Sequence, residues 1–172
     1  TLTNGRKAFP YRTCVVSSTQ SELVEKLDNI TEQQIIRSQN MTAAFVFCGQ
    51  GISHVTGLAK ALFSESAIFR QLLETCHQTL YANYSLDLLA MLLGDKETRH
   101  QPGTLLPTLF SLQYALAKTL IHEGINPQYL MGHSFGEYAA ACIAGVFELD
   151  DGLKIARERG VLIETLAPGA ML

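Results

Sequence analysis

The sequence predicts an α/β protein with a parallel sheet flanked by helices. Two short apolar runs, at residues 43–47 and 129–131, each lead into a glycine-containing turn, which is typical of buried parallel strands. Between and after these runs, apolar residues recur at spacings of three and four, which predicts helices. The order strand, helices, strand, helix is an α/β layout, so we place both strands in one sheet.

Residues 1–40 are predicted to form a separate linker with little apolar surface. Residues 1–10 are polar, and residues 13–17 are predicted to form a short strand. A helix is expected from Ser18 to Ile30, followed by a short polar helix over residues 31–38. This segment therefore has the composition of a small βα adaptor.

The main domain, residues 41–172, is predicted to begin with the strand at 43–47 and the turn Gly49-Gln50-Gly51. Such a turn lets the backbone N–H of Gln50 face a ligand without obstruction by a side chain. Because parallel strands end at one edge of a sheet, this turn and the turn after residue 131 are expected to share a site. Taken alone, Gly-Gln-Gly also fits a plain turn.

The rest of the domain is predicted to be mainly helical. Breaks are expected at Gly94, at Pro102-Gly103 and at Gly124. The predicted helices cover residues 54–63, 67–80, 86–93, 105–123, 138–144 and about 150–166.

The segment from Gly132 to Gly136 has the pattern G-x-S-x-G between a predicted strand and a predicted helix. This is the pattern of a nucleophile elbow, whose serine, here Ser134, sits in strained backbone at a tight turn. The N–H groups of Phe135 and Gln50 would then form an oxyanion hole. The alternative is a Gly-Ser turn between two core elements, with His133 as an ordinary loop histidine.

The last predicted helix carries an arginine, Arg159, within an apolar stripe, whereas Arg157 points to the opposite side. Because an unpaired guanidinium is costly to bury, Arg159 needs an anion or a route to the surface. An internal glutamate could supply that anion, and so could a substrate carboxylate held in two places. The stripe consists of Ile155, Leu162, Ile163 and Leu166.

Composition excludes several classes of protein. The 172 residues include 13 basic and 16 acidic side chains without a long run of either sign, which argues against a nucleic-acid partner. The four cysteines form no C-x-x-C pair, so we expect a reduced protein without a structural metal or bound cofactor. With no signal-peptide pattern and no apolar run of membrane-spanning length, we expect a cytoplasmic chain without a membrane partner.

Four segments together resemble acyltransferase domains of polyketide synthases and the related malonyl-CoA:acyl carrier protein transacylases. They are Phe45–Gly51, Leu112–Leu116, Gly132–Glu137 and Asp150–Arg159. The resemblance covers about residues 43–172. Residues 6–40 resemble the linker between a ketosynthase and an acyltransferase, which favours a multidomain synthase.

The resemblance implies an enzyme that transfers malonyl groups in two steps. Ser134 takes the acyl group from malonyl-CoA, and the phosphopantetheine thiol of an acyl carrier protein then accepts it. The resemblance also implies that the N–H groups of Gln50 and Phe135 form the oxyanion hole, that Arg159 pairs with the extender carboxylate, and that His133 lies with the substrate. The bulk of Phe135 favours malonyl over branched extenders. The neighbouring ketosynthase domain is a further implied partner.

The sequence also departs from the family pattern. Cys48 stands where the family usually has proline, and Leu106 stands where a glutamine commonly precedes Pro107, so we expect one polar contact near the substrate to be missing. The family's catalytic histidine and its ferredoxin-like subdomain lie beyond Leu172. We therefore expect a partial α/β-hydrolase-like core that is inactive by itself. The alternatives are an esterase of the α/β-hydrolase type and a non-catalytic docking piece of a megasynthase.

Overall fold

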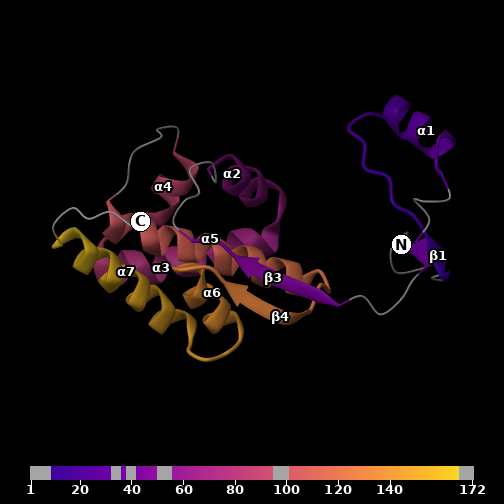
Figure 1. Ribbon diagram of the computed structural model, residues 1–172. Coiled ribbons are helices and arrows are strands. Elements are labelled where there is room, and N and C mark those ends of the chain that lie inside the picture. The colour runs from indigo at the N-terminus through magenta and orange to yellow at the C-terminus, as the bar shows by residue number, and fades with distance from the viewer. Residues whose placement is uncertain (1–8, 32–35, 38–41, 50–55, 95–100, 167–172) are drawn as a thin grey trace. The chain divides into compact units, whose positions relative to one another are not determined.

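The computed structural model describes residues 9–31, 36–37, 42–49, 56–94 and 101–166, and the chain divides into two compact units. The first unit is Thr1–Thr42 and the second is Ala43–Leu172. Figure 1 shows the elements of both units.

The first unit contains a two-stranded antiparallel sheet and one helix. Strand β1 is Tyr11–Arg12, helix α1 is Gln20–Asp28 and strand β2 is Ile36–Arg37. The strand predicted at residues 13–17 is wrong, because the pairing with β2 falls just before it. The helix predicted over residues 31–38 is also wrong in its described part, where the pairing between strands overrides a weak helical pattern.

Helix α1 is held by local contacts rather than by burial. Thr19 caps it by accepting the N–H of Glu22, and Glu22 reaches back to the N–H of Ser18. The ammonium of Lys26 and then the N–H of Ser18 hold the pKa of Glu22 below its usual value. None of the residues of α1 is buried, in keeping with the small apolar surface expected of this segment.

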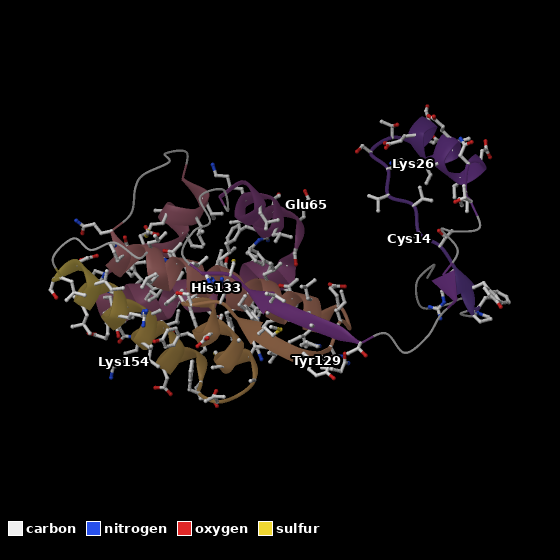
Figure 2. All side chains as sticks on the ribbon, viewed as in Figure 1. Cys14, Lys26, Glu65, Tyr129, His133 and Lys154 are labelled. Atoms are coloured by element: carbon white, nitrogen blue, oxygen red, sulfur yellow. The ribbon has the colours of Figure 1, made fainter. Side chains whose placement is uncertain are left out.

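The second unit is built on two parallel strands, β3 (Ala43–Phe47) and β4 (Pro127–Gly132). In their register, Phe45 lies opposite Leu130, and both pack against the core. The other face of the pair is exposed and carries Val46, Tyr129 and Met131, at 71%, 63% and 61% exposure. Figure 2 labels Tyr129 on this face. The parallel pairing and the strand positions confirm the prediction.

Six helices complete the described part of this unit, and each confirms a predicted helix to within a few residues. Ser66 and Asp87 cap two of them through their side-chain oxygens. The helices are α2 (Thr56–Glu65), α3 (Ala67–Tyr84), α4 (Leu88–Leu93), α5 (Pro102–His122), α6 (Gly136–Ile143) and α7 (Leu149–Glu164).

Helix α5 is the centre of the core. It contacts α3, α6 and α7, and most of its middle residues are buried, including Leu106, Phe110 and Leu112. A helix that is apolar on all sides belongs inside a fold, which explains why α5 is surrounded. Figure 1 shows α7 running along it, with α6 beside the two strands.

The face of α7 that packs against α5 is not the one predicted. The buried residues are Gly152, Leu153, Ala156 and Gly160, whereas Arg159 is exposed together with much of the predicted stripe. Leu162 and Leu166 are 64% and 68% exposed. Small residues repeat every four positions on the buried face, so the two helices approach closely. A Cβ at Gly152 would lie 2.3 Å from the ring of Phe110.

Two side chains of α7 complete the first turn of α5. Pro107 has no N–H to donate to the carbonyl of Gly103, one helical turn earlier. Arg157 Nη1 fills that role by donating to Gly103 O at 2.6 Å, and Glu164 Oε1 accepts the N–H of Gly103 at 2.6 Å. The two helices are therefore joined by hydrogen bonds as well as by apolar packing.

The four cysteines are free. Burial raises the pKa of Cys76 to about 12 and that of Cys142 to about 11, so both behave as small apolar side chains. Among the described residues, no group of histidine, cysteine and acidic side chains is arranged to hold a metal ion. None of the described helices combines the length and hydropathy needed to cross a lipid bilayer.

We expect Gly160→Ala to destabilise the second unit by about 2 kcal/mol, measured by denaturant unfolding. The added Cβ would lie 2.3 Å from the backbone oxygen of Pro102, so α7 must move away from α5, and this cost exceeds the roughly 1 kcal/mol of improved helix propensity. Gly57→Ala in α2 is the control, because no described atom lies within 4 Å of its added Cβ. An unchanged stability of Gly160→Ala would contradict the packing described for α7.

Candidate active site

The turn between β4 and α6 has the geometry of a nucleophile elbow. Ser134 has a φ of 53°, in the left-handed region that non-glycine residues rarely adopt. A Cβ at Gly132 would lie 2.3 Å from the backbone nitrogen of Glu137, and a Cβ at Gly136 would lie 2.3 Å from the carbonyl oxygen of Phe47. Both glycines of the motif are therefore required by close backbone approaches.

The end of β3 lies against this elbow. The N–H of His133 donates to the carbonyl of Phe47 at 2.8 Å. A Cβ built on Gly49 would be 3.2 Å from both Nδ1 and the carbonyl oxygen of His133, and 3.4 Å from the Cβ of Ser134. The two turns are thus adjacent at Gly49, as the sequence predicts, whereas Gln50 lies outside the described residues.

Ser134 and Arg159 line the same open cavity of about 410 Å³. The serine is exposed at the start of α6, and the arginine comes from the middle of α7. The other residues that line the cavity are Glu137, Tyr138, Ala141 and Phe147. The fold thereby places the exposed Ser134, on strained backbone, and the guanidinium of Arg159 around one cavity.

Arg159 is held by Tyr138. Its Nη1 donates to the tyrosine hydroxyl at 3.0 Å, and its Cζ lies 5.5 Å from the centre of the tyrosine ring. Of the two options that the sequence left open, the exposed side chain fits the route to the surface, so burial does not force Arg159 to find an anion. Exposure instead leaves the guanidinium accessible from the cavity.

Phe135 contributes its backbone, not its ring, to this region. The ring is fully buried and lies 5.5 Å from that of Tyr138, centre to centre, so the expectation that it fills space beside a substrate is wrong. The residue stands at the start of α6, where the helix dipole favours negative charge. No described residue accepts a hydrogen bond from its N–H.

No histidine is among the described residues that line the cavity. His133 is exposed in the elbow itself, and Figure 2 labels it near the ends of the two strands. His77 lies on α3, with Nδ1 3.8 Å from Asp87 Oδ1, and His122 ends α5. The described part of the chain therefore places a nucleophile and a cation around the cavity, but no histidine base.

The two departures from the family pattern have different surroundings. Leu106 is fully buried in the core and does not line the cavity, whereas Cys48 is half-buried beside the elbow. The carbonyl of Cys48 accepts a hydrogen bond from Gln113 Nε2 at 2.6 Å. This departure thus falls at the residue directly before Gly49, which lies against the elbow.

Sequence reasoning missed several residues that line the cavity, chiefly Tyr138 and Glu137. Tyr138 follows Ser134 by four positions at the start of a helix, a spacing that returns a side chain to the same face. That spacing could have predicted a ring beside the serine. Its pairing with Arg159 could not be predicted, because it depends on how α7 crosses α6.

A comparison with protein families matches residues 44–172 to the acyl transferase domain. The chain belongs to the acyltransferase domains of polyketide synthases. It is 34% identical over 172 residues to orsellinic acid synthase of Beauveria bassiana (strain ARSEF 2860), covering 95% of this chain and 8% of the synthase. The family assignment replaces the interpretation as an esterase of the α/β-hydrolase type.

Solved acyltransferase structures share the fold. The acyl transferase domain of ZmaA superposes with a TM-score of 0.85 at 32% identity, covering 96% of this chain and 40% of that one. The malonyl-CoA:ACP transacylase of Synechocystis sp. PCC 6803 gives 0.60 at 31% identity, covering 71% of this chain and 40% of that one. The predicted mixed α/β fold is confirmed, and the chain spans less than half the length of these acyltransferase structures.

We expect Ser134→Gly to be more stable than Ser134→Ala by about 1 kcal/mol. Glycine relieves the left-handed strain at φ 53°, whereas alanine removes the hydroxyl and keeps the strain. Thermal unfolding of the two variants measures the difference. Ser85 has a φ of 54° at the end of α3, so Ser85→Gly and Ser85→Ala calibrate the effect outside the site. Equal stabilities for the two Ser134 variants would show that the elbow is not strained.

Proposed function

We propose that this chain is the part of a malonyl-type acyltransferase that carries the acylated serine, and that the enzyme acts in polyketide synthesis. The observation that carries the proposal is the cavity shared by Ser134, in a strained elbow, and Arg159, an exposed guanidinium. The serine supplies the nucleophile, and the arginine supplies a partner for the free carboxylate of the acyl group.

The first step loads the enzyme. Ser134 Oγ attacks the thioester carbonyl of malonyl-CoA, its proton passes to a base, and a C–O bond forms. The developing oxyanion is met by the N–H of Phe135 at the start of α6 and, by family resemblance, by the N–H of Gln50. The C–S bond then breaks, and coenzyme A leaves as a thiol with that proton.

The second step reverses the first with a different thiol. The phosphopantetheine thiol of an acyl carrier protein gives its proton to the base and attacks the ester on Ser134. The C–O bond breaks, Ser134 regains a proton, and the malonyl thioester leaves on the carrier. Because no described residue of the cavity is a histidine, we assign the base, by family resemblance, to a histidine beyond Leu172.

In this proposal Arg159 determines which acyl group the enzyme accepts. A guanidinium presents paired N–H donors that match a carboxylate, so malonyl gains an interaction that acetyl lacks. Tyr138 occupies one Nη of Arg159 and fixes its direction. In this proposal His133 contacts the substrate from the elbow, and Glu137 restricts where a carboxylate can sit, because two carboxylates repel each other.

Residues 1–40 are assigned to the linker that joins the acyltransferase to a ketosynthase, and residues 41–172 to the acyltransferase. The support is the separation of the chain into two compact units near this boundary and the absence of buried residues in α1. A segment that buries so little of its own surface gains stability by packing on a neighbouring domain.

The proposal predicts a malonyl ester on Ser134. Intact-protein mass spectrometry after brief incubation with malonyl-CoA should show the adduct on the natural full-length polypeptide and not on its Ser134→Ala variant. The 172-residue chain by itself should load far more slowly, because the family resemblance places the catalytic histidine beyond Leu172. A full-length polypeptide that keeps Ser134 and gains no adduct would favour a non-catalytic docking role.

Replacing Arg159 should separate malonyl transfer from plain acyl transfer. We expect Arg159→Ala to slow malonyl loading about 100-fold, since charge-assisted hydrogen bonds to the carboxylate are lost, while acetyl loading stays unchanged. Lys154→Ala is the control, because it removes the same charge from an exposed position of α7 that does not line the cavity (Figure 2). Equal losses for malonyl and acetyl would contradict a role in carboxylate recognition.

A further inference from the structure

Gln113 links the central helix to the turn beside Ser134. It lies on α5 with only 8% of its surface exposed. Its Nε2 is 2.6 Å from the carbonyl oxygen of Cys48 and 3.4 Å from the sulfur of Cys48. A buried amide therefore bonds the residue that directly precedes Gly49.

The orientation of this amide follows from the group it contacts. A backbone carbonyl can only accept, so the amide must turn its NH₂ group toward Cys48 and its oxygen away. That oxygen, Oε1, has no hydrogen-bond partner among the described residues. Among the described residues, the hydrogen bonds of the Gln113 side chain therefore go only to Cys48.

Gln113 differs in this respect from the other buried polar residues of α5. The hydroxyls of Thr108, Ser111 and Thr119 each donate to the carbonyl four residues earlier in the same helix. Those bonds satisfy the side chain locally. Of the buried polar residues described on this helix, Gln113 alone reaches across to the end of β3.

The end of β3 is consequently fixed from two directions. The elbow holds it through the bond from His133 N–H to Phe47 O, and α5 holds it through the bond from Gln113 to Cys48 O. Gly49 comes next and lies against His133 and Ser134. A shift of Cys48 would therefore move the backbone that faces the serine.

We propose that Gln113 is a positioning residue for acyl transfer. It holds the Cys48–Gly49 turn against the elbow, so that the backbone after β3 keeps its place beside Ser134. The inference rests on the proposed function of Ser134, since the turn that Gln113 holds lies against that serine. Gln113 belongs to the segment Leu112–Leu116, which the sequence connects to the family by resemblance but to which it assigns no role.

The test compares Gln113→Leu with Thr119→Val in the natural full-length polypeptide. Both replace a buried polar residue of α5, but Thr119 bonds only its own helix. Loading of Ser134 from malonyl-CoA should slow about tenfold in Gln113→Leu, the equivalent of one lost hydrogen bond, and stay near the wild-type rate in Thr119→Val. The ratio of malonyl to acetyl loading should not change, because Arg159 is untouched.

A second variant gives a readout that a merely structural residue would not. The carboxylate of Gln113→Glu cannot donate to Cys48 O, but its neutral acid can, and burial raises the pKa of such a carboxyl group. Loading by Gln113→Glu should therefore recover toward the wild-type rate as the pH falls, whereas the deficit of Gln113→Leu stays constant. This series decides the question even if Gln113→Leu fails to fold.

Hydrogen exchange of the peptide that spans residues 43–49 tests the link without any substrate. It should be faster in Gln113→Leu than in wild type or Thr119→Val. Unchanged exchange together with wild-type loading in Gln113→Leu would overturn the inference. If wild-type protein shows no Ser134-dependent adduct, the proposed function fails instead, and the role in transfer falls with it.

Discussion

The pairing of α7 with α5 through Gly103 is the constraint on which the site depends. One glycine has its N–H accepted by Glu164 and its carbonyl bonded by Arg157, and both partners lie on α7. These bonds set the rotation of α7 about its own axis. Because residues two apart on a helix point roughly 200° apart, holding Arg157 on α5 turns Arg159 away from it, toward Tyr138 and the cavity.

Ser134 is placed by a second constraint. Gly132 and Gly136 allow the backbones of β4, α6 and β3 to approach more closely than any side chain permits, and Ser134 takes up the resulting strain. Strain of this kind persists only where the surroundings hold it. Here β3 and α5 provide that support through Phe47 and Gln113.

The sequence predicted the features that depend on short-range sterics. The elbow follows from glycine spacing, and β3 from an apolar run that ends in glycine. The buried face of α7 was missed because Gly152, Ala156 and Gly160 contribute little to an apolar stripe, although small residues are what allow close helix contact. The strands of the first unit were missed because two-residue strands exist only through their pairing, which no local pattern encodes.

Pro107 makes one carbonyl of α5 depend on a distant segment of the chain. A proline inside α5 leaves the Gly103 carbonyl without its helical donor, and the replacement comes from Arg157, which leaves the ribosome much later. That carbonyl therefore gains a donor only when α7 packs against α5. Since the same packing places Arg159 around the cavity that Ser134 lines, a contact that satisfies the backbone of the central helix also helps to assemble the cavity.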